Sequence, residues 1–109
     1  MGKQNVAVAA RKVYCISNLR LFWNNGTSDI EYGPADLVDY TKDLFVRGDA
    51  VPPGETLFWL LGPIGGTVVP TTSWSVTIAA NTLQPNTDYT FQIDNPNRTE
   101  AGIEFRTTP

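Results

Sequence analysis

The chain has 109 residues and a net charge of −3, and 41% of its residues are hydrophobic, 11% aromatic and 17% charged. This composition is too apolar and too aromatic for a disordered chain, and the length suits a single domain, expected to span residues 1–109. The longest apolar run, 57–61, is far shorter than the roughly 20 residues that a membrane-spanning helix needs, so no membrane partner is expected. Only Arg11 and Lys12 are adjacent among the scattered basic residues, which argues against a nucleic-acid partner.

The first 15 residues carry no secretion or lipidation signal. Arg11 and Lys12 interrupt an alanine–valine stretch before it can form the apolar part of a signal peptide. Gly2 begins a myristoylation pattern, but Val6 stands where that pattern needs Ser or Thr. We therefore expect either synthesis in the cytoplasm or a mature domain that begins with an added methionine. The single cysteine, Cys15, excludes an intramolecular disulfide and is expected to fill a small space in the core.

Alternating apolar and polar residues predict β-strands from the first third of the chain onward. Leu19, Leu21 and Trp23 share one face of a strand, and Asn24-Asn25-Gly26 favours a tight turn into a short strand at 29–32. Two further runs, 13–16 and 56–61, are apolar on both faces. Such runs are typical of central strands or of strands that another chain covers.

The segment that follows the short strand fits two structures. Pro34 lies where it favours the first turn of a helix, and apolar residues at helical spacing then predict one short helix at 35–45, formed around Leu37, Tyr40, Leu44 and Phe45. The same segment fits a strand equally well, because a strand would place Val38, Tyr40, Leu44 and Val46 on one face. The pattern does not separate the helix from the strand.

The second half of the chain alternates strictly in three runs, which predict strands at 73–78, 88–93 and 103–106. Residues that break regular structure separate the runs: Pro52-Pro53-Gly54, Gly62-Pro63, Gly65-Gly66 and Asn95-Pro96-Asn97. Short strands with this punctuation predict an all-β fold in which two antiparallel sheets pack as a sandwich.

One stretch resembles a known family. Leu83-Gln84-Pro85-Asn86-Thr87-Asp88-Tyr89 is similar to the L-x-P-x-T-x-Y signature of fibronectin type III-like domains, where it forms the turn between strands E and F. The resemblance implies a tyrosine corner, in which Tyr89 buries its ring and its hydroxyl returns to nearby backbone. It also implies structural roles for Leu83 and Pro85, and a core that contains Phe91 and Phe105.

Residues 17–24 resemble strand B of the same family, which implies that Trp23 packs in the core. The resemblance does not extend to residues 29–69, where strands C and C′ of the family are not evident. An immunoglobulin-like relative is therefore the alternative.

The residues of the commonest catalytic arrangements are missing, and an enzyme would have to rely on carboxylates alone. The chain has no histidine, so the commonest general base and metal ligand is absent, and neither a Ser-His nor a Cys-His arrangement can form. Asp36, Asp39 and Asp43 would share a helix face and form either a solvated acidic edge or a weak calcium site, but their spacing does not match a calcium loop. We expect a protein that is not an enzyme and uses no cofactor or metal.

Three motifs suggest binding, each with a simpler structural explanation. Arg47-Gly48-Asp49 spells the integrin-binding tripeptide, or else a turn after a strand. Asn25-Gly26-Thr27 and Asn97-Arg98-Thr99 match the glycosylation sequon, or else ordinary turns. Trp74 begins a strand and, if exposed in a row with Tyr32 and Tyr40, would suit a sugar; core packing is the alternative.

These observations favour a non-catalytic structural or interaction module that acts as a subunit of a larger homo- or hetero-oligomeric assembly. Threonine- and asparagine-rich turns and low charge suit a bacteriophage or virus particle protein, such as a capsid decoration or tail component, which would end in the virion. The alternative is a carbohydrate-binding or adhesive β-sandwich.

Overall fold

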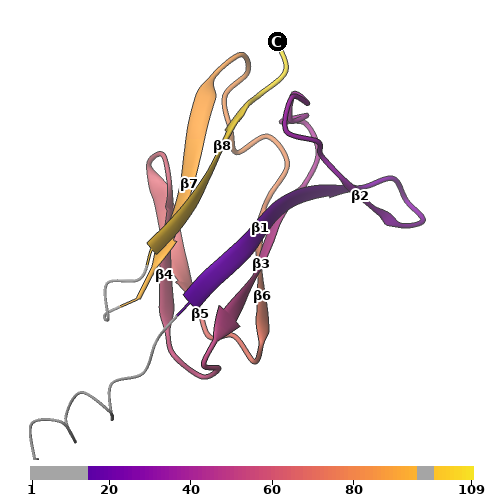
Figure 1. The fold of residues 1–109 in the computed structure, drawn as a ribbon. Helices are drawn as coiled ribbons and strands as arrows, with labels where there is room; N and C mark the ends of the chain where they lie inside the picture. The colour runs from indigo at the N-terminus through magenta and orange to yellow at the C-terminus, as the bar shows by residue number, and fades with distance from the viewer. Residues whose placement is uncertain (1–14, 96–99) are drawn as a thin grey trace, which may run out of the picture.

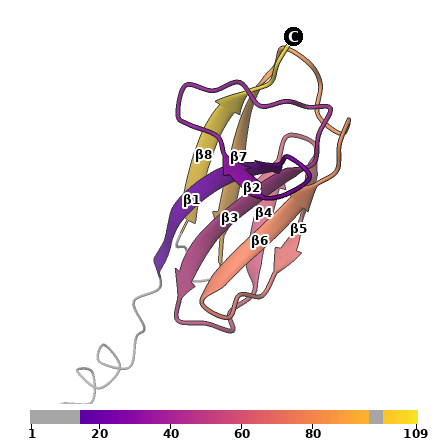
Figure 2. The same cartoon turned by 90° about the vertical axis from the view of Figure 1, so that its right-hand side faces the viewer.

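The computed structural model describes residues 15–95 and 100–109, which form eight strands and no helix. The strands are β1 (Cys15–Asn24), β2 (Asp29–Glu31), β3 (Leu44–Val51), β4 (Leu57–Leu61), β5 (Ile64–Val68), β6 (Ser73–Ile78), β7 (Asp88–Asp94) and β8 (Glu100–Arg106). They form two antiparallel four-stranded sheets, ordered β2-β1-β3-β6 and β5-β4-β7-β8, that pack as a sandwich (Figures 1 and 2). The all-β sandwich expected from the sequence is confirmed.

The core lies between the sheets and is centred on a stack of three aromatic rings. Phe91 of β7 is fully buried, and its ring stacks on Trp59 of β4 at 5.8 Å and on Trp74 of β6 at 6.0 Å between centroids. Because Trp74 belongs to one sheet and the other two rings to the opposite sheet, the stack joins the two layers.

Each tryptophan of this stack lies directly opposite a glycine on the neighbouring strand. Trp74 pairs with Gly48 of β3, and Trp59 pairs with Gly66 of β5. A Cβ atom added at Gly48 would lie 2.5 Å from Cζ2 of Trp74, so the indole occupies the space that any side chain there would need. The two glycines therefore let broad rings lie flat against the strands.

The helix expected at 35–45 is wrong, because the backbone of this segment bonds to a distant strand end. The amide of Val38 donates to the carbonyl of Arg106 at 2.8 Å, and the carbonyl of Val38 accepts from the amide of Thr108 at 2.9 Å. Val38 is thereby buried as an isolated bridge beside Thr107. These backbone groups are the ones a helix would use internally. The strand alternative holds only from Leu44, where β3 begins.

Strand β1 contains an irregularity that sequence patterning does not reveal. Its pairing with β3 shifts between Ser17 and Arg20, and Asn18 adopts a positive φ of 59°. This is the geometry of a β-bulge, in which one strand carries an extra residue. Asn18 also donates a hydrogen bond from Nδ2 to Asp49 Oδ2 at 3.1 Å.

Two residues expected in the core lie outside it. β1 runs on into a hairpin with β2 that projects from the side of the sandwich (Figure 1), so Trp23 lies beyond the core and is partly exposed. Its ring instead lies 5.4 Å from the Nζ atom of Lys42. Cys15 is exposed, because it alternates with the buried Ile16 at the start of β1. Of the predicted strand 13–16, the structure describes only Cys15 and Ile16.

The turn before β7 has the tyrosine-corner geometry that the sequence implied. The hydroxyl of Tyr89 accepts a hydrogen bond from the amide of Gln84 at 2.8 Å, and its ring stacks on Phe105 at 5.7 Å. Leu83 is buried beneath this turn, while Pro85 is exposed at its tip.

Candidate binding face

The β5-β4-β7-β8 sheet exposes apolar side chains on its outer side. In β4, Leu57 and Leu61 point into the core, while Phe58 and Leu60 point outward and keep 47% and 52% of their surface exposed. We define the outer face as the exposed residues of this sheet around that pair: Phe58, Leu60, Gly65, Thr67, Thr90, Gln92, Asp94, Glu100, Gly102 and Glu104. β4 has a paired strand on each side, so the two apolar side chains lie within the sheet and not at its edge.

A shallow groove of about 430 Å³ lies on the β7–β8 side of this face. Its walls include Thr90, Gln92 and Glu104, and its floor lies at Gly102, which has no side chain and pairs with Gln92. A Cβ atom at Gly102 would approach the carbonyl oxygen of Phe91 to 3.2 Å. The floor of the groove at Gly102 therefore carries no side chain that could fill it.

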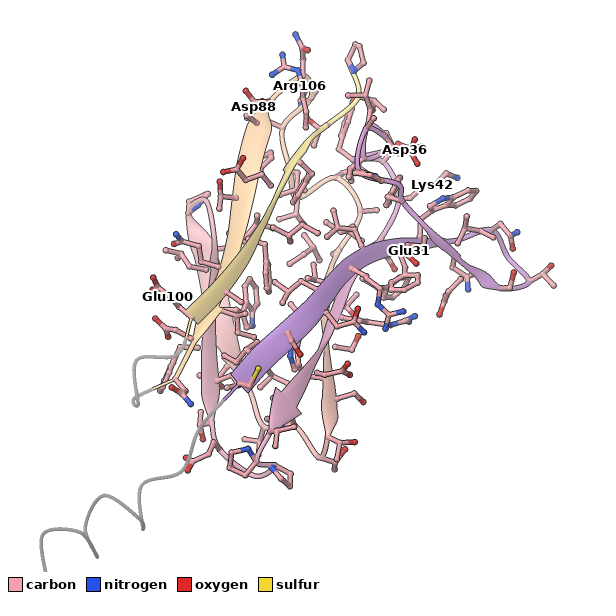
Figure 3. All side chains as sticks on the ribbon, in the orientation of Figure 1. Glu31, Asp36, Lys42, Asp88, Glu100 and Arg106 are labelled. Carbon is pink, nitrogen blue, oxygen red and sulfur yellow. The ribbon has the colours of Figure 1, made fainter. Side chains whose placement is uncertain are left out.

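The outer face is acidic. Asp94 and Glu100 are directly opposite across β7 and β8, an arrangement of like charges that destabilises a sheet unless a cation offsets it. Glu104 adds a third carboxylate, opposite Thr90. Among the described residues, the one basic residue on this side of the sheet is Arg106. It lies at the far end from Glu100 (Figure 3), where it is bound to Asp88 at 2.8 Å and to Asn86.

The opposite sheet carries the Arg47-Gly48-Asp49 motif, and the turn expected there is wrong. All three residues lie inside β3, which is paired on one side with β1 and on the other with β6. Gly48 is buried under Trp74. The tripeptide is therefore not presented as a loop. Trp74, considered above as a possible binding residue, keeps only 4% of its surface exposed and belongs to the core.

Arg47 is held in place on the outer side of its sheet. Its guanidinium bonds to Asp29 at 2.8 Å and lies over the rings of Phe22 and Phe45, at 4.8 and 5.4 Å from their centroids. Hydrogen bonds from Asn24 and from Arg47 lower the pKa of the Asp29 carboxyl. Through these contacts, Arg47 links the projecting hairpin to β3.

The three carboxylates considered for calcium act separately. Asp36 accepts from the amide of Gly33 at 2.6 Å, and Asp43 accepts from the amide of Ala80 at 2.8 Å. Asp39 accepts from the amide and hydroxyl of Thr41, and these bonds lower its pKa. Asp36 and Asp39 thus fix their own turns, and Asp43, the residue before β3, bonds to the loop after β6. Across 15–95 and 100–109, no group of three or more His, Cys, Asp or Glu residues is placed to hold a metal ion.

The remaining sequence candidates also have local partners. The hydroxyl of Tyr32 accepts from the amide of Asp39, and burial raises its pKa; both Tyr32 and Tyr40 pack against the core. Asn25, the acceptor of the first sequon, uses its side-chain oxygen to bond the amides of Thr27 and Ser28. The second sequon, at 97–99, lies outside the described residues.

The sequence pattern did contain the signal for the outer face. The run 56–61 is apolar on both faces, and the structure shows that only one of these faces is covered. No helix in the described part of the chain is long and apolar enough to cross a membrane. Comparison with protein-family models, with curated proteins and with solved structures gave no match.

Proposed function

We propose that the protein is a non-catalytic interaction module that binds a protein partner through the outer face of the β5-β4-β7-β8 sheet and so acts as a subunit of a larger assembly. The observation that carries the proposal is the exposure of Phe58 and Leu60 on a strand in the interior of that sheet. Contiguous exposed apolar side chains with a polar surround are characteristic of protein interaction sites.

The surroundings of the apolar pair support protein binding. Thr67, Gln92 and Thr90 supply uncharged polar groups around Phe58 and Leu60, and the acidic groove lies next to them. An apolar centre with a polar rim is the usual anatomy of a protein interface.

The experiment compares the full chain with a Phe58→Thr/Leu60→Thr variant by analytical ultracentrifugation over a range of concentrations. The matched control is Leu37→Thr, because Leu37 is also 47% exposed but lies in the loop before β3, away from the outer face. We expect the full chain and the control to associate, and the double variant to remain monomeric. Association that the double variant leaves unchanged would refute the proposal.

We also propose that the sandwich is fibronectin type III-like. The hydrogen bond from Gln84 to Tyr89 supports this assignment, and so do β4 and β5, which lie where the family has strands C and C′. Under this assignment β6, β7 and β8 correspond to strands E, F and G. Strand B then corresponds to β3, and the stretch at 17–24 is the strand before it.

For the larger assembly, we propose a bacteriophage or virus particle, on the basis of the low charge and the threonine- and asparagine-rich turns. Co-sedimentation of the protein with particles from the source, or its absence from them, decides this point. A carbohydrate-binding function has less support, because Trp74 is buried and Tyr32 and Tyr40 pack against the core.

A further inference from the structure

We infer that the partner of the outer face is the N-terminal segment of a second copy of this chain, residues 1–14, so that copies join head to tail. This inference rests on the function proposed above and names the partner. Three independent features support it: the charge of the face, the apolar side chains next to it, and the distribution of charge along the sequence.

The charge of the face calls for a basic partner. Asp94, Glu100 and Glu104 are all exposed, and within 15–95 and 100–109 no basic side chain forms an ion pair with any of them. The direct opposition of Asp94 and Glu100 is unfavourable in the isolated subunit. A cationic segment that lies along the groove would remove this repulsion, so binding gains more than it would from an isolated surface ion pair.

Residues 1–14 have the complementary composition. They contain Lys3, Arg11 and Lys12 and no acidic residue, whereas all 11 acidic residues of the chain lie at or after Asp29. Between the cations lies Val6-Ala7-Val8-Ala9-Ala10, a short apolar stretch that matches Phe58 and Leu60. The segment thus offers cations for the groove and small apolar side chains for the exposed pair.

The segment joins the fold close to the acidic residues. It leads into β1, which lies in the sheet opposite the outer face and contacts β8, the strand that carries Glu100 and Glu104. A segment of 14 residues spans roughly 46 Å when extended, which is long enough to reach the outer face of a neighbouring copy. The assembly role proposed above favours that neighbour over the same copy.

A contact of this kind uses two different surfaces of the same chain. Each copy gives its N-terminal segment to one neighbour and its outer face to another, so the contact is heterologous and repeats into a ring or an open filament. Such a contact extends beyond a dimer, whereas an isologous contact through the Phe58–Leu60 pair alone closes as a dimer.

The test is a charge-reversal mixing experiment on the full chain. One variant reverses the segment, with Lys3→Glu, Arg11→Glu and Lys12→Glu. The other reverses the face, with Asp94→Lys, Glu100→Lys and Glu104→Lys. We expect each variant alone to associate at least about tenfold more weakly than the original chain, and the equimolar mixture to recover association, because opposite charges then meet between copies.

The controls separate this inference from the proposed function. Circular dichroism and thermal melting establish that each variant is folded, and milder variants with Gln or Asn at the same positions replace any that is not. If the Thr variants of Phe58 and Leu60 abolish association but neither charge variant weakens it, the face is an interface with another occupant, and this inference is wrong. If the mixture stays monomeric while each variant is folded, residues 1–14 dock on the outer face of their own copy. That result also overturns the head-to-tail inference.

Discussion

A single added methyl group at Gly48 tests the packing of the core, because two effects of opposite sign compete there. Replacing glycine by alanine inside a strand ordinarily stabilises a protein by about 0.5–1 kcal/mol, since glycine loses more conformational entropy on folding. The Cβ atom of Gly48→Ala would lie 2.5 Å from Cζ2 and 2.8 Å from Cε2 of Trp74. Forcing extra atoms into a packed core costs about 1–3 kcal/mol.

The second effect should win, because the indole has no room to retreat. Trp74 is 4% exposed, and its other side is stacked on the fully buried Phe91. We therefore expect Gly48→Ala to lower the free energy of unfolding by about 1–2 kcal/mol, which corresponds to a fall in melting temperature of roughly 4–16 °C for a domain of this size.

The assay is urea denaturation followed by tryptophan fluorescence, with Gly66→Ala as the matched control. Gly66 faces Trp59 in the same way, but its Cβ would lie 3.0 Å from the nearest ring atom and Trp59 is only partly buried. We expect a loss less than half as large there. A Gly48→Ala variant more stable than the original chain would refute the packing described for Trp74.

Three further changes test the turn, the stack and the charged loops. Tyr89→Phe removes the acceptor of the Gln84 amide and should cost about 1 kcal/mol in urea denaturation; no loss would contradict a tyrosine corner. Phe91→Ala should cost about 3–5 kcal/mol, because the ring is fully buried between two tryptophans, and a cost under 1 kcal/mol would count against the stack. The pKa values of Asp29 and Asp39 are lowered from 3.8 in the folded state, so their contribution to stability is complete above pH 3.8 and is lost as the pH falls through the lower, folded-state values. Melting temperatures measured from pH 6 downward should therefore drop below this pH, with a smaller drop in Asp39→Asn.

Patterns of residues two apart predicted those parts of the fold whose pairing is local in sequence. The runs at 73–78 and 88–93 became β6 and β7, because strict alternation leaves one apolar row for the core. The tyrosine corner was also predictable, since Gln84 and Tyr89 are only five residues apart and lie in one turn.

Long-range contacts account for the errors. Val38 is fixed by hydrogen bonds to Arg106 and Thr108, nearly 70 residues away in sequence, and no local pattern encodes that partner. Trp23 was assigned to the core through the resemblance of residues 17–24 to strand B of the fibronectin type III family, but the point where β1 leaves the sandwich depends on the hairpin with β2. For Trp74, the neighbouring Gly48 on another strand decided its burial.

The candidate face was only half predictable. An apolar run on both faces of β4 indicated either a central strand or a strand that another chain covers. β4 is central in its sheet, with one face in the core and the other face exposed. The acidic groove could not be foreseen, because Asp94 and Glu100 face each other only through the register of β7 and β8.

Hydroxyl-radical footprinting of the full chain, read by mass spectrometry at low and high protein concentration, tests most directly whether the β5-β4-β7-β8 sheet is an interface. If it is, the oxidation rates of Phe58 and Leu60 fall as concentration rises while that of the equally exposed Leu37 stays constant. The account would be contradicted if the oxidation rates of Phe58 and Leu60 did not change while the protein associates. It would also be contradicted if they changed with concentration in the same proportion as the rate of Leu37.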